Sequence, residues 1–278
     1  MRAIEAIVKR NLLNFIRDKG RLLGSLAMSF FFLFIFSFMM KSPVTEISQP
    51  MNYLISGIII MTVFQTSISN STDILTDIAS GFMKEVLVAP ISRAQISIGH
   101  ILSTTVIAVI QGILITLISL FIGLKLDIFN FTEMIGLMAI AGLTFGSIGL
   151  FLATISRNSS SFQIVSTMIM MPFTFLSGAY IPTTLMPKFL LPLVYINPLT
   201  YLTAIFRFIT LKMQDLPISE LIRQGMAYDI HGFIVTPFMG LMAIIVIGLV
   251  FFALCVFQFN KADFSNVKVA RHGGGARN

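Results

Sequence analysis

Long apolar runs separated by short polar segments dominate the sequence. A helix that crosses a bilayer needs about 20 mainly apolar residues. Six segments meet this requirement, at residues 22–40, 51–72, 96–123, 134–155, 161–180 and 233–259. The first run contains no charged residue, and its end, FSFMMKSP, offers no small-residue cleavage site typical of a signal peptide. The pattern predicts an all-α fold: a polytopic membrane protein with six transmembrane helices in a single domain over residues 1–278.

A different hydrophobic pattern precedes the first run. Apolar side chains recur at helical spacing on one face, and basic side chains lie mostly on the other; the apolar set is Ile4, Ile7, Val8, Leu12, Phe15 and Ile16. A basic amphipathic helix beside a transmembrane segment lies in the plane of the membrane interface. The pattern therefore predicts such a helix within residues 1–20, and a solvated tail is the alternative.

The segment between the second and third runs, residues 73–95, mixes charged and apolar residues. It reads DILTDIASGFMKEVLVAPISRAQ, and Pro90 ends any helix there. Apolar side chains that remain exposed on such a connection indicate a partner surface. Contact with interfacial lipid is the alternative explanation.

Proline is concentrated where helix breakers are least expected. Five of the ten prolines, Pro172, Pro182, Pro187, Pro192 and Pro198, lie in or just before the apolar stretch LSGAYIPTTLMPKFLLPLVYINPLTYL. Such spacing cuts residues 182–212 too often for one transmembrane helix. The stretch predicts short re-entrant helices after the fifth span, with their broken backbone shielded by protein or water. An apolar loop packed on the outer face is the alternative.

Composition and charge agree with a membrane class and set an orientation. The chain is 56% hydrophobic and only 11% charged, whereas soluble domains have about 25% charged residues. With six spans, Lys and Arg outnumber acidic residues on the side that carries both termini and balance them on the other side. This asymmetry places both termini in the cytoplasm and residues 181–232 outside.

The net charge of +7 is therefore topogenic, and we expect no nucleic-acid partner. A single cysteine, Cys255, excludes a disulfide within the chain.

The sequence lacks the common motifs of an energy-coupling or catalytic site. It has no G-x-x-x-x-G-K-[ST] stretch for nucleotide phosphates, no H-E-x-x-H and no G-x-S-x-G. No Asp, Glu, Lys or Arg falls in the middle of a predicted span, where ion-coupled carriers usually place one. The spans contain mild polarity instead, such as Gln65 and Gln111, which serves either as interhelical hydrogen bonds or as the lining of a path.

Two stretches resemble the permeases of ATP-binding-cassette (ABC) exporters. The first is GFMKEVLVAPISRAQISIGHIL, and the second is FLSGAYIPTTLMPKFLLPLVYINPLTYLTAIFR, with its S-G-x-x-x-P, N-P-L-T-Y and following arginine. The turn GLFLATISRNSSSFQ also fits. The resemblance covers nearly the whole chain and is greatest to the drug-resistance and nodulation-factor branch.

The resemblance implies a dimer of six-span subunits in the cell membrane, each docked to a separate cytoplasmic ATPase that binds ATP and Mg²⁺. No cofactor or metal is then expected in this chain, which is not itself an enzyme. The N-terminal helix would be an elbow, and residues 73–95 would contain the ATPase coupling contact, carried by Phe82, Met83, Lys84, Glu85, Leu87, Pro90 and Arg93. Membrane lipid, the ATPase and a second permease copy are the implied partners.

The same resemblance assigns the prolines to an outer gate over a cavity lined by the first, second and fifth spans. The expected gate residues are Pro182, Pro187, Asn197 and Pro198, and the expected substrate path includes Phe64, Gln65 and Phe173. The function implied is export of an amphipathic or lipid-like substrate. A membrane scaffold or sensor that only recruits an ATPase is the alternative. An ion-coupled carrier is disfavoured, because broken helices occur in only one half of the chain.

Overall fold

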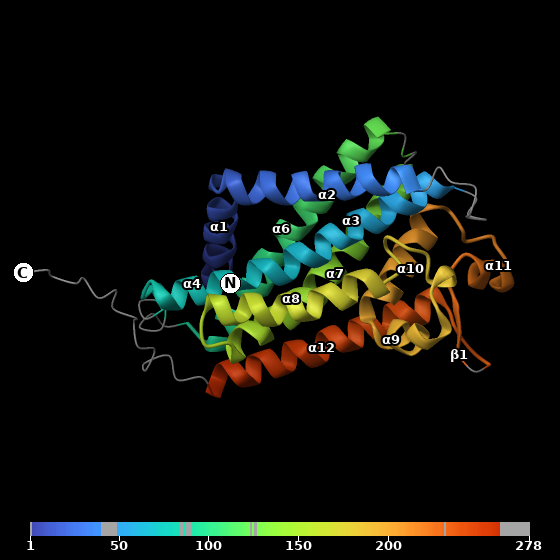
Figure 1. Cartoon of the computed structure of the whole chain (residues 1–278). Helices are drawn as coiled ribbons and strands as arrows, with labels where there is room; N and C mark the ends of the chain where they lie inside the picture. The colour runs from blue at the N-terminus through green and yellow to red at the C-terminus, as the bar shows by residue number, and fades with distance from the viewer. Residues whose placement is uncertain are drawn as a thin grey trace, which may run out of the picture.

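A computed structural model describes residues 2–39, 49–83, 86, 91–122, 124, 127–230 and 232–261. Its long helices run along one common direction, and α1 lies across one end of the bundle (Figure 1). The helices that form this bundle are α1 (Arg2–Arg17), α2 (Lys19–Met39), α3 (Pro50–Ser69), α6 (Arg93–Ile122), α7 (Ile128–Ile155), α8 (Ser159–Leu176) and α12 (Pro237–Lys261). Each predicted apolar run thus contains a long helix, with bounds that differ by a few residues.

Helix α3 is the most enclosed element of the fold. It continues through the short helix η1 (Asn70–Thr72) into α4 (Asp73–Ala79), so that residues 50–79 form one extended rod. In the most apolar 18-residue window of this rod, 83% is buried inside the protein, whereas the corresponding window of α12 is only 17% buried. Helices α6 and α7 pack on it, while α2 and α8 flank it with exposed apolar side chains. The protein core therefore follows α3 from end to end.

Small residues allow the close packing around this rod. A β-carbon at Gly142 would lie 2.8 Å from the Thr105 side chain on α6, and one at Gly149 would lie 2.5 Å from Ser71 Oγ. Small residues three to four positions apart, here Gly142, Gly146 and Gly149, let helix backbones approach closely. Gly142 and Gly149 thus bring α7 against α6 and η1.

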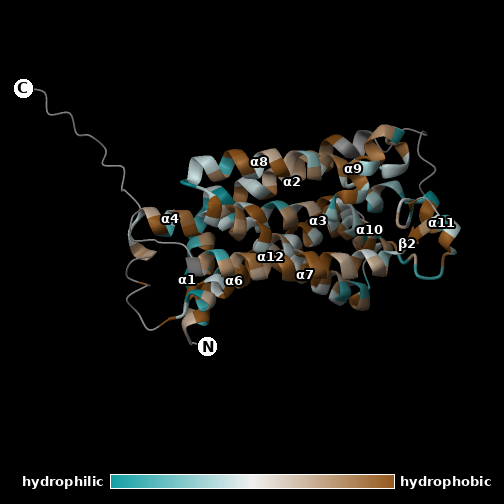
Figure 2. Cartoon of the chain, turned by 90° about the horizontal axis from the view of Figure 1, so that it is seen from below, coloured by the Kyte–Doolittle hydropathy of each residue, from teal (hydrophilic) through white to brown (hydrophobic). Residues whose placement is uncertain are grey.

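Four helices that the structure describes are long and apolar enough to cross a membrane: α3 with its continuation, α6, α7 and α12. The number rises to five if the bent pair Lys188–Ile196 and Pro198–Thr210 forms one broken span. The chain is therefore a multi-pass α-helical membrane protein, and the count of six spans stays a prediction. Hydrophobic residues run along the long helices, and hydrophilic residues gather at both ends of the bundle (Figure 2).

The proline-rich stretch folds into short helical pieces, as the sequence predicted. They are η2 (Thr183–Leu185), η3 (Lys188–Leu190), α9 (Leu191–Ile196) and α10 (Pro198–Thr210). The axes on the two sides of the break at Asn197 differ by 86°. Pro182 and Pro187 directly precede η2 and η3; their rings fix φ, here −52° and −57°, and with ψ of 134° and 143° the backbone is extended at both. Each proline therefore separates one piece from the next.

One small element was not predicted. Residues 228–235 form an antiparallel hairpin of β1 (Tyr228–Ile230) and β2 (Phe233–Val235), which follows the short helix α11 (Ile218–Arg223). The predicted sixth span therefore starts too early, at 233, whereas α12 begins at Pro237. Proline is favoured at the first turn of a helix, where its missing N–H is not needed. Residues Phe233–Val235 are apolar, so they extended the predicted sixth span, but in the structure they pair with β1 as a strand.

Candidate functional site

The connection after α4 is tied to the N-terminal helix by Arg10. Its guanidinium forms a bidentate ion pair with Asp77, with Nη1 2.7 Å from Oδ2. The same guanidinium lies 3.9 Å from the centre of the Phe82 ring. The hydrogen bond to Asp77 raises the pKa of Arg10 above its usual value, so the group stays charged. Arg10 therefore holds α1, α4 and the start of the 73–95 segment together.

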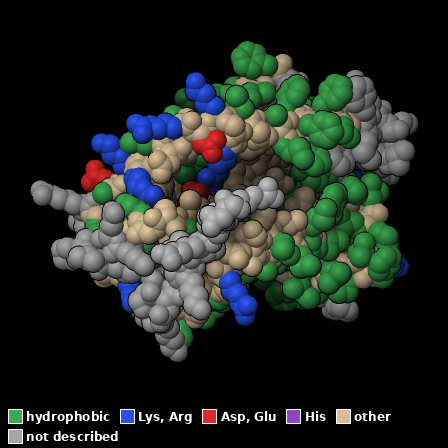
Figure 3. Space-filling model, turned by 60° about the vertical axis from the view of Figure 1, so that its left-hand side comes forward, with side chains coloured by type: hydrophobic (Ala, Val, Ile, Leu, Met, Phe, Trp, Pro, Cys, Tyr) green, Lys and Arg blue, Asp and Glu red, His purple; other side chains and the backbone are tan. Residues whose placement is uncertain are grey.

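A second arginine, on α2, forms a similar set of hydrogen bonds to the end of the α3 rod. Arg21, on α2, donates to Asp73 at 2.8 Å and also to the side-chain oxygen of Asn70. On α1, Asn11 donates to Ser103 on α6 at 3.0 Å. These contacts join α1, α2 and α6 to the end of the α3 rod. Lys and Arg side chains gather on this end of the molecule (Figure 3).

The structure describes three of the expected coupling residues, Phe82, Met83 and Arg93, and all three lie at this end of the bundle. Phe82 is half-buried, and Arg93 donates from Nη1 to the Phe259 carbonyl of α12 at 3.1 Å. Met83 differs from expectation, because it is only 2% exposed and belongs to the chain's own core. The other expected contacts, Lys84, Glu85, Leu87 and Pro90, lie outside the described residues. Binding of an ATPase by this segment stays a prediction.

The opposite end of the bundle is organised by Arg207, which is 2% exposed. Its guanidinium lies 3.4 Å from the centre of the Tyr53 ring on α3. It donates to three main-chain carbonyls, those of Tyr53 at 3.1 Å, Gly178 at 2.8 Å and Ala179 at 2.7 Å. No carboxylate in the described part of the chain pairs with it. The sequence placed this charge in the external, re-entrant region 181–232, and in the structure it lies in the protein interior, where it joins α3, α10 and the turn after α8.

Asn197 and Thr200 secure the C-terminal end of α8. Asn197 accepts a hydrogen bond from Leu199 N at 3.0 Å, which makes it the N-cap of α10. Its amide group also donates to the Phe173 carbonyl at 2.9 Å, and the Thr200 hydroxyl donates to the Leu176 carbonyl at 3.3 Å. The last carbonyls of a helix have no partner within the helix. The N-P-L-T sequence thus fixes α10 to the end of α8.

The three expected path residues lie in different surroundings. Phe64 is fully buried and packs edge-to-face on Phe145, with ring centres 4.7 Å apart, so it faces the core rather than a cavity. Phe173 is half-buried at the end of α8. Gln65 lines a cavity of 270 Å³ between α2, α3 and α6. Of the three, Gln65 is the one that lines either of the two cavities described for this part of the chain.

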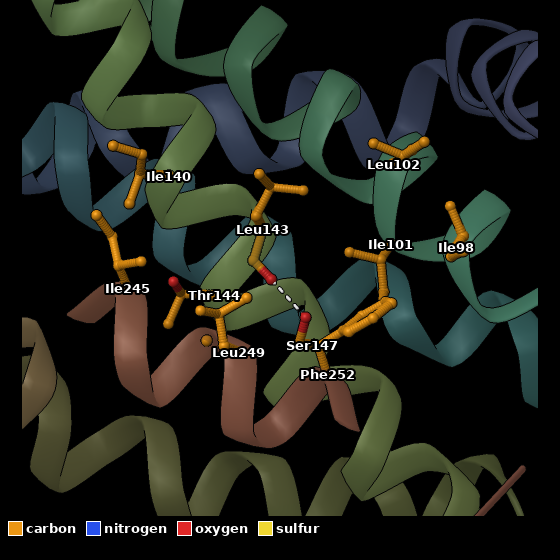
Figure 4. A pocket seen from close by; sticks show the side chains of 11 residues that line it. Ile98, Ile101, Leu102, Ile140, Leu143, Thr144, Ser147, Ile245, Leu249 and Phe252 are labelled. Atoms are coloured by element: carbon orange, nitrogen blue, oxygen red, sulfur yellow. Dashed lines mark hydrogen bonds between the residues drawn. The ribbon is translucent and has the colours of Figure 1, made fainter. Parts of the chain in front are cut away.

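A larger cavity of 460 Å³ lies between α6, α7 and α12 (Figure 4). Its wall is apolar, with side chains such as Ile101, Leu143 and Phe252 pointing into it. The two hydroxyls in the wall are already used, since Thr144 donates to the Ile244 carbonyl at 3.3 Å and Ser147 to the Leu143 carbonyl at 2.7 Å. This cavity offers no free polar group to orient a ligand.

The described residues contain no group of three or more His, Cys, Asp or Glu side chains able to hold a metal ion. The two arginine sites at the ends of α3 were not predicted from the sequence. A signal for one of them was present, because Arg207 is a lone charge within the apolar sequence AIFRFIT. For Arg10 and Asp77, separated by 67 residues, no local pattern indicated the pairing.

Comparison with known proteins agrees with this architecture. The family described as ABC-2 type transporter matches residues 2–211. The chain is 26% identical over 176 residues to the inner membrane transport permease YadH of Escherichia coli K12, a match that covers 60% of this chain and 66% of that protein, just under two thirds. It is 29% identical over 213 residues to the putative transport permease ycf38 of Porphyra purpurea, covering 74% and 73%.

A third relative is the probable multidrug ABC transporter permease YbhR of Escherichia coli K12. The chain is 30% identical to it over 169 residues, which are 59% of this chain and 44% of that protein. The family match includes α1, the 73–95 segment, the proline-broken helices and Arg207. With its multi-pass helical fold, the chain belongs to the ABC-2 type transporter family.

Proposed function

We propose that this chain is the transmembrane subunit of an ATP-driven exporter in the cytoplasmic (inner or plasma) membrane. A separate ABC ATPase would supply the energy, and an amphipathic or lipid-like molecule would be moved outward. Family membership supports an ATPase partner in general, and the names of the relatives YadH and YbhR support an inner membrane location and a drug-like cargo.

The observation that carries the proposal is the way the rod of residues 50–79 joins two distant sites. At one end, Asp77 is held by Arg10 beside Phe82, in the segment expected to contact the ATPase. At the other end, the Tyr53 carbonyl and ring are held by Arg207, which also holds the turn before Pro182. Packed rigid elements transmit displacements between sites. Movement of the coupling segment would therefore reach the proline-broken helices through α3.

The proline-broken helices would then act as the outer gate. Pro182, Pro187, Asn197 and Pro198 separate short pieces that a continuous helix would fuse, and Asn197 fixes the 86° bend to the end of α8. The pieces η2, η3 and α9 have few buried residues and would move at lower cost than α10, which is buried against α3 and α12. The gate would lie outside the cell, with both termini in the cytoplasm. The hydrogen bond from Arg93 to the Phe259 carbonyl brings the end of α12 to the α1 end of the bundle, which agrees with both termini lying on one side of the membrane.

A second copy of the chain would complete the path. Helices α2 and α8 flank α3 and expose large apolar side chains, among them Phe31 at 52%, Phe34 at 54% and Met168 at 72%. These two helices pack on α3 with one side only, and Figure 2 shows them on the same face of the bundle. Dimerisation across this face would enclose a cavity lined by α2, α3 and α8, with lipid around the remaining helices.

The test is reconstitution with a cognate ABC ATPase. The complex is expected to co-purify and to move a fluorescent amphiphile into inside-out vesicles only when ATP is present. Phe82→Ala is expected to reduce co-purification, because it removes the ring that lies against Arg10 in the expected coupling segment. Phe129→Ala, at an exposed position on α7, is the matched control. A complex that hydrolyses ATP but moves no amphiphile would support the scaffold or sensor alternative instead.

A further inference from the structure

The cavity between α6, α7 and α12 lies away from the face proposed for the second copy. Figure 2 shows α7 and α12 on the opposite side of the bundle from α2 and α8. Helix α12 is the least enclosed of the candidate spans, and its side chains Val246, Leu249 and Val250 are 54%, 63% and 51% exposed. Exposed apolar side chains on a helix that crosses a membrane contact lipid. This side of the bundle therefore faces the bilayer.

The cavity is a gap that two close helix contacts leave open. A β-carbon at Gly248 would lie 2.6 Å from Thr144 Oγ1, so α12 packs tightly on α7. Helix α6 packs on the same helix through Gly142, opposite Thr105. Both neighbours are thus held by α7, and the side chains that α6 and α12 direct toward each other do not fill the space between them (Figure 4). We call this space, of 460 Å³, the α6–α12 groove.

The groove is open to the surrounding lipid. Three leucines that line it, one from each helix, are partly exposed: Leu102 at 37%, Leu143 at 41% and Leu249 at 63%. Ile101, in contrast, is 3% exposed and lies deeper in the wall. A molecule in the membrane can therefore enter between the leucines without any helix moving apart.

The chemistry of the wall determines what can occupy the groove. Its two hydroxyls, of Thr144 and Ser147, already donate to main-chain carbonyls. A water molecule needs two to four polar partners, and apolar cavities stay dry but bind apolar molecules. The groove therefore excludes water and polar ligands and fits hydrocarbon.

The dimensions of the groove favour a single chain over a protein helix. Arg93 and Lys261 are the ends of α6 and α12 nearer α1, and counting 1.5 Å per residue from them places Ile98 about 8 Å and Ile245 about 24 Å along the helices. This length of about 16 Å is about half of the 30 Å hydrocarbon core of a bilayer. A helix with its side chains is about 10 Å wide, so 16 Å of helix would need more than about 1,000 Å³.

We propose that the α6–α12 groove binds one acyl chain of a phospholipid from the leaflet on the α1 side, and that this lipid stays bound while the surrounding lipid exchanges. The chain contacts Ile101, Leu143 and Phe252 and replaces the side-chain packing that α6 and α12 lack. A chain held by three helices makes more dispersion contacts than lipid on an open helix face, so it leaves more slowly. The proposal rests neither on export nor on an ATPase, because the groove belongs to a single chain.

The test uses the chain alone, and the absence of tryptophan from the sequence makes one introduced tryptophan a specific reporter. Phe252→Trp places it in the groove wall. Val250→Trp, at an exposed position of α12 outside the groove, is the control at nearly the same depth. Both proteins are reconstituted in nanodiscs of phospholipid brominated at mid-chain, which quenches a nearby tryptophan. They are then diluted into mixed micelles of detergent and unbrominated phospholipid.

We expect both tryptophans to be quenched in the nanodiscs and to differ after dilution. The fluorescence of Val250→Trp should recover at once, and that of Phe252→Trp at least several-fold more slowly. Equal recovery rates would overturn the proposal, because they would leave only ordinary contact with bulk lipid. A Phe252→Trp protein that is not quenched in nanodiscs would also overturn it and would indicate that protein side chains cover the groove.

Two filling variants assign the slow recovery to the groove. Ser147→Leu adds hydrocarbon to the wall, and the hydroxyl that it removes donates to the Leu143 carbonyl of its own helix. Leu143→Phe enlarges an exposed rim residue and is the milder change. In the Phe252→Trp protein we expect either variant to abolish slow recovery, whereas Ser160→Leu, exposed on α8, should retain it. Slow recovery in both filling variants would contradict the assignment.

The number of bound lipids gives an independent measurement. Native mass spectrometry of the chain in detergent should detect one retained phospholipid per chain, and the Ser147→Leu variant should retain none. Adding phospholipid to the delipidated chain should raise its melting temperature by several degrees, with a smaller rise in the variant, because a ligand stabilises the state that binds it. A chain that retains no phospholipid, or a variant that retains as much as the unchanged protein, would refute the proposal.

Discussion

The guanidinium of Arg207 lies 3.4 Å from the centre of the Tyr53 ring and donates to the Tyr53 carbonyl at 3.1 Å. The two residues are 154 positions apart and both are almost fully buried. A buried arginine is stabilised here by a ring and three carbonyls and not by an acid. Carbonyl acceptors and an aromatic face stabilise a buried cation while keeping its partners uncharged. This contact closes the end of the helix bundle that lies opposite α1.

Replacing Arg207 by lysine should destabilise the protein strongly. Lysine retains the charge but cannot span three carbonyls with a planar fork or stack on Tyr53 in the same way. Hydrogen bonds to charged groups contribute about 1.5–3 kcal/mol each, so we expect a loss of at least about 2 kcal/mol. Thermal unfolding in nanodiscs measures it. Arg223→Lys, at an exposed pair with Glu220, should change stability by less than about 1 kcal/mol. Equal effects of the two substitutions would contradict the structural role of Arg207.

Two glycine substitutions should have opposite signs. A methyl group at Gly57 would meet the Ala179 carbonyl oxygen and lie 2.7 Å from Arg207 Nη2, so Gly57→Ala should cost about 1–3 kcal/mol through overpacking. A methyl group at Gly136, in α7, meets nothing within 4 Å, and Gly136→Ala should stabilise the helix by about 0.5–1 kcal/mol. The melting temperatures of the two variants, compared with that of the unchanged protein, test these signs. A Gly57→Ala variant as stable as the unchanged protein would show that α3 does not approach the turn after α8 this closely.

The Arg10–Asp77 pair should matter for coupling more than for folding. Asp77→Asn removes the ion pair that holds α1 to α4 and leaves Arg10 beside Phe82 without its carboxylate. We expect the variant to insert and bind the ATPase, while export per ATP hydrolysed falls several-fold. Parallel assays of transport and ATP hydrolysis in vesicles measure this ratio. Asp215→Asn, at an exposed position near the other end, is the control. An unchanged ratio would remove the pair from the coupling route.

Removing the prolines at the expected gate should impair export alone. In a Pro182→Ala/Pro187→Ala variant, the fixed breaks before η2 and η3 are lost and neighbouring pieces become free to extend. We expect normal expression and ATPase binding, with transport reduced about tenfold, which corresponds to about 1.4 kcal/mol in the barrier. Pro217→Ala, before α11, should transport normally. Full export by the double variant would leave this stretch with a packing role only.

Orientation can be measured with an impermeant thiol reagent. In a Cys255→Ser background, Asp215→Cys should be labelled in intact cells, because residues 181–232 are expected outside. Lys268→Cys, in the tail beyond the described residues, should be labelled only after permeabilisation. The physical reason is the excess of Lys and Arg on the side that carries the termini. Labelling of Lys268→Cys in intact cells would reverse the topology.

Much of the fold was available from the sequence because its signals are local. Apolar runs of about 20 residues, the amphipathic spacing before Lys19 and the clustered prolines each report on a few adjacent residues. They predicted the long helices, α1 and the short pieces around Asn197 correctly, while the hairpin at 228–235 was missed. The motifs around Pro182 and Asn197 also indicated the permease family, which the match over residues 2–211 confirms.

The sites that join these helices depended on tertiary structure. Met83, an expected ATPase contact, and Phe64, an expected path residue, both pack inside, since burial is decided by which helices surround α3. Arg207 falls in the external, re-entrant region expected from the sequence, but only the fold shows that three distant carbonyls hold it in the core. Hydrogen bonds and ring contacts between residues 67 or 154 positions apart leave no periodic trace in the chain. The sequence therefore determined the helices and the family, and the packing of α3 decided which side chains meet at its two ends.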